Sequence, residues 1–150
     1  MKVSVASDMD TAVARAVVDE LRKRGHDPVV HGALAEGERA DWAWACERAA
    51  RDVAEGTAEQ GIVCCWTGTG ASIAANKVAG IRAALCGDAE TARGARTWND
   101  ANVLALSLRT TSEPLLEEIL DGWFATASSD DPSDRANVEH VDELDAARAR

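Results

Sequence analysis

Short runs rich in β-branched and other apolar residues alternate with longer alanine-rich stretches along most of this 150-residue chain. Such alternation is typical of βαβ units, in which a helix connects two parallel strands and packs on their sheet. We therefore expect an α/β fold with a parallel sheet. Five runs are interpreted as strands: Lys2 to Ser7, Asp27 to His31, Gly61 to Trp66, Ile81 to Cys86 and Asn102 to Ser107. The third and fourth are nearly continuous apolar runs, which is typical of strands buried on both faces.

The stretches between the strands have helical spacing of apolar residues. Helices are predicted over 11–24, 41–55, 71–78, 89–97 and 113–126. A polar, turn-prone segment, Ser128 to Asp134, then separates a core of residues 1–126 from a last helix over 134–150. Val138, Val141 and Leu144 form a thin apolar stripe on that helix, which docks either on a partner subunit or on its own domain. The length fits a single domain.

The charge balance excludes several classes of partner. Sixteen Lys and Arg residues against 26 Asp and Glu give a formal net charge of -10, which repels nucleic acid and anionic lipid. The first ten residues lack a secretory signal, and no apolar run approaches the roughly 20 residues that span a bilayer. We therefore expect a cytoplasmic protein without nucleic-acid or membrane partners. The four cysteines include no C-x-x-C pair, which favours free thiols.

The segment from Cys64 to Lys77 reads as a buried strand, a glycine-rich turn and a helix. Ligands of parallel sheets bind at the carboxyl ends of strands, and backbone N–H groups around Gly68 and Gly70 could converge there on a phosphate or an enediolate oxygen. The spacing fits neither the dinucleotide nor the P-loop pattern. Because neighbouring strand residues face opposite ways, one of Cys64 and Cys65 belongs to the core and the other approaches the turn. A thiol there is either a small buried side chain or a base or nucleophile.

Three segments resemble the family of type B ribose-5-phosphate isomerases and galactose-6-phosphate isomerases. They are CWTGTGASIAANK at 65–77, GIRAALC at 80–86 and RTWNDANVL at 96–104, and the resemblance spans about residues 2 to 126. It implies a three-layer α/β/α Rossmann-like domain that works as a homodimer with active sites built from both subunits. It also implies aldose–ketose isomerisation through an enediolate, without a cofactor or a metal.

The resemblance also implies roles for single residues. Cys65 would remove the proton next to the carbonyl, Thr67 would move a proton between oxygens, and Asn99 would hydrogen-bond a substrate oxygen. A second subtype of the family places a glutamate base where this chain has Ala71, which leaves Cys65 as the candidate. The residues expected to contact substrate are Asp8, Asp41, Gly68, Thr69, Gly70, Trp98 and Arg109.

The chain departs from the family pattern at several of these positions. Trp98 replaces the histidine that opens the furanose ring, and Trp66 replaces a glycine of the turn. Ser133 and Asn137 fall near the places of two phosphate-binding arginines. We therefore expect an isomerase of a small sugar or sugar phosphate that is inefficient with ribose 5-phosphate. The alternative is a non-catalytic sugar-binding or regulatory homologue that kept the fold.

Overall fold

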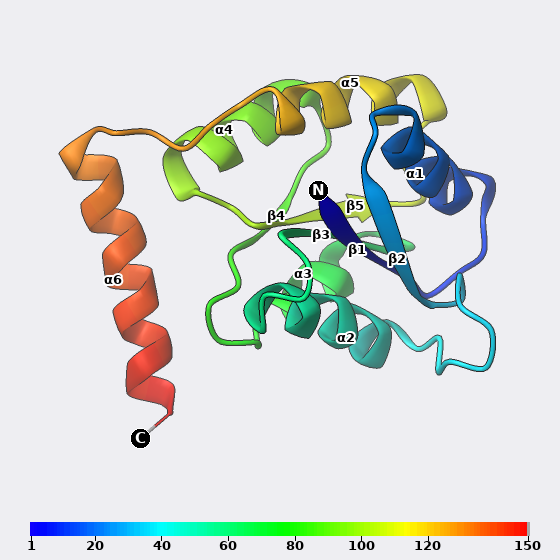
Figure 1. The fold of residues 1–150 in the computed structure, drawn as a ribbon, viewed down its shortest axis with the longest axis horizontal. Coiled ribbons are helices and arrows are strands. Elements are labelled where there is room, and N and C mark those ends of the chain that lie inside the picture. The colour runs from blue at the N-terminus through cyan, green and yellow to red at the C-terminus, as the bar shows by residue number, and fades with distance from the viewer. Residues whose placement is uncertain (150) are drawn as a thin grey trace.

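The computed structural model describes residues 1–149 and confirms the α/β prediction. Five parallel strands form one sheet in the order β2-β1-β3-β5-β4 (Figure 1). The strands are β1 (Lys2–Ser7), β2 (Asp27–Gly32), β3 (Gln60–Cys65), β4 (Ala83–Leu85) and β5 (Val103–Ser107). The helices are α1 (Ala12–Lys23), α2 (Trp42–Ala54), α3 (Thr69–Ala75), α4 (Ala89–Asn99), α5 (Glu113–Phe124) and α6 (Pro132–Arg148).

Two hydrophobic clusters on opposite faces of the sheet give the fold its three layers. Helices α1, α4 and α5 cover one face, and α2 and α3 cover the other (Figure 1). Alternation along β3 divides its two cysteines between these faces. Cys64 packs in the cluster under α1, α4 and α5, whereas Cys65 packs in the cluster under α2 and α3.

The fourth strand differs from its sequence prediction. It contains three residues and lies at the edge of the sheet, with Leu85 40% exposed, so the expectation of a strand buried on both faces is wrong. Side chains add hydrogen bonds at the start of this strand. The Asn76 amide bonds both the N–H and the carbonyl of Ala83, and the Arg82 N–H donates to Asn102 Oδ1. These contacts join the start of β4 to the end of α3 and to the residue before β5.

Helix α6 stands apart from the three layers (Figure 1) and has no buried side chain. On the predicted stripe, Val141 is 43% exposed and Leu144 is 52% exposed, so the stripe remains available for a partner. The expected helix reached Arg150, which lies outside the described residues. No helix within residues 1–149 is long and apolar enough to cross a membrane.

Candidate active site

The glycine-rich turn between β3 and α3 is fixed by close backbone approaches. Gly68 has φ +75°, and a Cβ there would lie 2.9 Å from backbone atoms of both Leu106 and Ser107. A Cβ on Gly70 would lie 2.9 Å from the Trp42 ring, which packs over the start of α3. Gly68 therefore requires glycine, whereas a Cβ on Gly70 would displace the Trp42 ring. The turn lies against the end of β5 on one side and the start of α2 on the other.

Cys65 is the last residue of β3 and lies under this turn. Its side chain is buried, and its Sγ accepts a hydrogen bond from the Ala71 N–H at 3.3 Å. The other three cysteines are also free thiols. Burial raises the pKa of Cys46 and of Cys86 to about 12 and raises that of Cys64 as well, so these three stay protonated at neutral pH.

Donors and acceptors gather on the turn that follows Cys65. The Oγ1 atoms of Thr67 and Thr69 lie 2.8 Å apart, and both side chains are exposed. The first N–H groups of a helix have no acceptor inside the helix, and those of Thr69 and Gly70 bond to nothing else in residues 1–149. An oxyanion bound here would meet two free N–H donors beside a hydroxyl pair.

The end of β5 and the residues that follow it fix the turn. The Trp66 carbonyl accepts hydrogen bonds from Ser107 Oγ at 3.1 Å and from the Arg109 N–H at 2.9 Å. The Arg109 side chain is exposed and forms no ion pair within the described part of the chain. Ser107 could not be identified from the sequence, because its contact with Trp66 depends on β5 lying beside β3. A sequence pattern does not give the strand order.

Two acidic residues lie near the same edge of the sheet. Asp8 follows β1, and its N–H donates to the Cys64 carbonyl at 3.4 Å. Its Oδ1 is buried and has no partner within residues 1–149, and burial raises the pKa of this carboxyl group. Asp41 precedes α2 and is exposed, with its Oδ2 2.6 Å from Arg39 Nε. Asp8 thus carries an acceptor that a ligand hydroxyl could satisfy.

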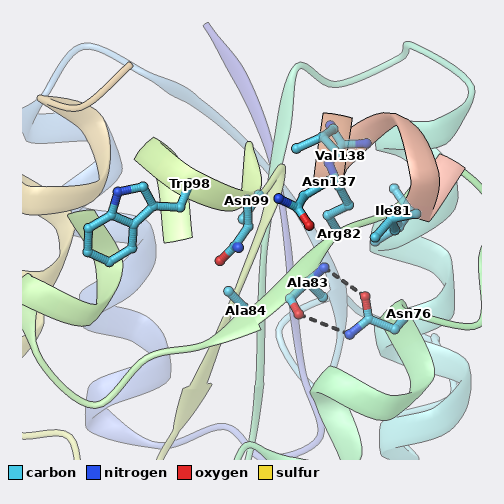
Figure 2. A pocket seen from close by; sticks show the side chains of 11 residues that line it. Asn76, Ile81, Arg82, Ala83, Ala84, Trp98, Asn99, Asn137 and Val138 are labelled. Carbon is cyan, nitrogen blue, oxygen red and sulfur yellow. Dashed lines mark hydrogen bonds between the residues drawn. The ribbon is translucent and has the colours of Figure 1, made fainter. Parts of the chain in front are cut away.

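Trp98 and Asn99 lie elsewhere in the subunit. They are the last residues of α4, which leads into β5, so they lie at the amino edge of the sheet while Cys65 lies at the carboxyl edge. Both line a pocket of about 390 Å³ between the sheet and α6, shown in Figure 2 with Asn137 from α6. One chain therefore does not bring Asn99 to Cys65. The structure does bring together the turn residues, Asp8 and the backbone of Arg109.

The described residues contain no group of three or more His, Cys, Asp or Glu side chains arranged to hold a metal ion. Residues His26, His31 and His140 lie outside the turn. His31 is held between carboxylates, with Nε2 2.7 Å from Asp52 and Nδ1 3.2 Å from Glu38. These two contacts satisfy both ring nitrogens of His31, which indicates a structural role for this side chain.

Comparisons with known proteins agree with this geometry. The profile of the Ribose/Galactose Isomerase family matches residues 3–141. The chain is 34% identical to galactose-6-phosphate isomerase subunit LacB of Clostridium acetobutylicum over 96% of this chain and 83% of that protein. It is also 34% identical to D-erythrulose-4-phosphate isomerase of Pectobacterium atrosepticum, over 81% and 82% of the two chains.

A solved structure of ribose-5-phosphate isomerase B from Clostridium thermocellum superimposes with a TM-score of 0.89. The two sequences are 35% identical, and the match covers 99% of each chain. The family profile, the relatives and the fold thus agree over nearly the whole length. The chain belongs to the ribose/galactose isomerase family.

Proposed function

We propose that this protein is a cofactor-independent aldose–ketose isomerase of a small sugar phosphate, with Cys65 as its base. The observation that carries the proposal is the position of the Cys65 thiol. Its sulfur lies at the end of β3 and accepts the Ala71 N–H, and the turn that follows carries two exposed threonine hydroxyls. The Ala71 N–H thereby places the sulfur at the start of α3, where the N–H groups of Thr69 and Gly70 have no other acceptor within residues 1–149.

The reaction follows from these groups. The Cys65 thiolate removes the proton from the carbon next to the substrate carbonyl, and the electron pair moves to the carbonyl oxygen, giving an enediolate. The free N–H groups of Thr69 and Gly70 donate to that oxygen, where charge develops only during the reaction. The Thr67 hydroxyl moves a proton between the two oxygens. Cys65 then returns its proton to the neighbouring carbon, which completes the isomerisation.

The described subunit supports an active site shared between two copies. Cys65 and Asn99 lie at opposite edges of one sheet, so Asn99 contacts the substrate only if it comes from a partner. A second copy would bring its Trp98 and Asn99 to the turn. The exposed Val141 and Leu144 of α6 give such a partner an apolar surface.

We expect a homodimer, with a mass by light scattering near twice the 15.9 kDa of the chain at micromolar concentration. Deletion of residues 134–150 removes the exposed stripe and should weaken association. A full-length monomer near 16 kDa would contradict the shared site. A dimer that is unchanged by the deletion would contradict the part assigned to α6.

The direct test is the incorporation of solvent deuterium. The proton held on the Cys65 thiol can exchange with solvent before it is returned, so erythrulose 4-phosphate or ribulose 5-phosphate incubated with the protein in deuterium oxide should gain deuterium at the reacting carbon. We expect isomer formation together with the label. Sugar-phosphate binding without any label, across substrates of four to six carbons, would instead identify the non-catalytic homologue.

A further inference from the structure

The Arg82 side chain joins the C-terminal helix to the end of α4. It precedes β4, and the side chain as a whole is 18% exposed. Nη1 donates to Asp142 Oδ1 on α6 at 3.1 Å. Nε donates to the Asp100 carbonyl at 2.9 Å, and Nη2 lies 3.2 Å from Asp100 Oδ2. One side chain thus uses all three of its nitrogens to contact α6 and the residue that follows Asn99.

Asp100 has a backbone conformation that needs such support. It is the one non-glycine residue among 1–149 with positive φ, at φ 42° and ψ 45°. This left-handed region is disfavoured for residues with a Cβ, although aspartate tolerates it better than most. A second arginine, Arg96, donates to the Ala101 carbonyl and lies 3.5 Å from Asp100 Oδ1. The turn that ends α4 is therefore fixed by two guanidinium groups.

The position of α6 depends largely on polar contacts, since none of its side chains is buried. Besides the Arg82–Asp142 pair, Asp145 Oδ2 accepts the Gly80 N–H at 2.8 Å. Figure 2 shows Arg82 beside Asn137 and Val138 of α6, on the wall of the pocket that Asn99 also lines. A displacement of α6 would therefore move the Arg82 guanidinium, which contacts Asp100.

We propose that Arg82 is a positioning residue that couples the placement of α6 to the orientation of Trp98 and Asn99. The consequence for turnover rests on the proposed function, in which Asn99 bonds a substrate oxygen in the partner's site. Arg82 does not touch substrate. It transmits the position of a helix at the subunit surface to the end of α4 through the Asp100 turn.

The test combines hydrogen–deuterium exchange with kinetics on two variants. Asp142→Ala removes the α6 side of the link, and Arg82→Met removes the guanidinium while keeping an unbranched side chain. Both should raise amide exchange several-fold at residues 97–101. They should lower kcat about 10-fold with KM within about 3-fold, because small misplacements of a positioned group cost rate.

Matched controls separate this coupling from a general loss of charge. Glu143→Ala removes an acid on α6 that pairs with His140, and Arg93→Met removes an arginine on α4 that pairs with Glu90. Neither should change exchange at residues 97–101 or kcat. If both controls reproduce the effects of the test variants, the coupling is wrong.

The remaining outcomes also decide the matter. If Arg82→Met fails to fold, Asp142→Ala gives the answer, because Asp142 lies on the surface with 53% of its side chain exposed. Faster exchange confined to α6, with residues 97–101 and kcat unchanged, overturns the proposal. If the unaltered protein isomerises no sugar phosphate, the proposed function fails, and exchange at residues 97–101 still decides whether Arg82 couples the two elements.

Discussion

Replacing Cys65 with alanine is expected to lower kcat by a factor on the order of 100 or more, since removal of a general base has an effect of this size. The thiol is buried, and its sulfur is placed by the Ala71 N–H at 3.3 Å. No other cysteine lies at the turn, because Cys64 packs on the opposite face of the sheet, Cys46 lies within α2 and Cys86 follows β4. The measurement is kcat with erythrulose 4-phosphate and, in parallel, the rate of deuterium incorporation.

Cys65→Ser separates the base from the hydrogen-bond acceptor. The serine oxygen can still accept the Ala71 N–H, so the fold should be kept, but its hydroxyl is far too weak an acid to supply the anionic base near pH 7. We expect Cys65→Ser to be folded and nearly inactive. Near-full turnover by either Cys65 variant would show that another group removes the proton.

Cys64→Ala is the matched control on the neighbouring residue. Cys64 packs in the cluster under α1, α4 and α5, on the opposite face of the sheet from the turn. Removing its sulfur leaves a small cavity and should cost about 1 kcal/mol of stability. For a chain of this size that corresponds to a fall in Tm of about 3 °C. Turnover per folded subunit should stay close to that of the unaltered protein.

The order of the elements could be predicted from the sequence because each strand and helix carries its own periodicity. The division of Cys64 and Cys65 between two faces followed from the alternation along a strand. The burial of β4 could not be predicted in this way. An apolar run such as IRAALC does not reveal whether its strand is central or at an edge, since that depends on the strand order.

The candidate site divides in the same way. Cys65, Thr67 and the glycines are contiguous in sequence, so a local motif was enough to place them together. The contacts of Ser107, Arg82 and Asp142 join segments far apart in the chain and required the fold. The position of Asn99 at the other edge of the sheet could not be predicted either, because its motif does not indicate where α4 ends.

Ribose 5-phosphate is expected to be a poor substrate, with kcat/KM about 100-fold below that of erythrulose 4-phosphate. Ribose 5-phosphate is mostly a closed furanose, and opening the ring requires an acid–base group worth roughly this factor. The family resemblance implies a ring-opening histidine where this chain has Trp98. An indole N–H donates a hydrogen bond without exchanging its proton near pH 7. A tetrose phosphate carries its phosphate on the hydroxyl that would close the ring, so it stays open.

The measurement compares kcat/KM for erythrulose 4-phosphate, ribose 5-phosphate and free pentoses. Trp98→His is the informative variant, because Trp98 is 59% exposed and its replacement should not disturb the core. If the missing acid–base group limits ribose 5-phosphate, histidine should raise its kcat/KM at least about 10-fold and leave the open-chain substrate nearly unchanged. A preference of the unaltered protein for ribose 5-phosphate would mean that another group opens the ring.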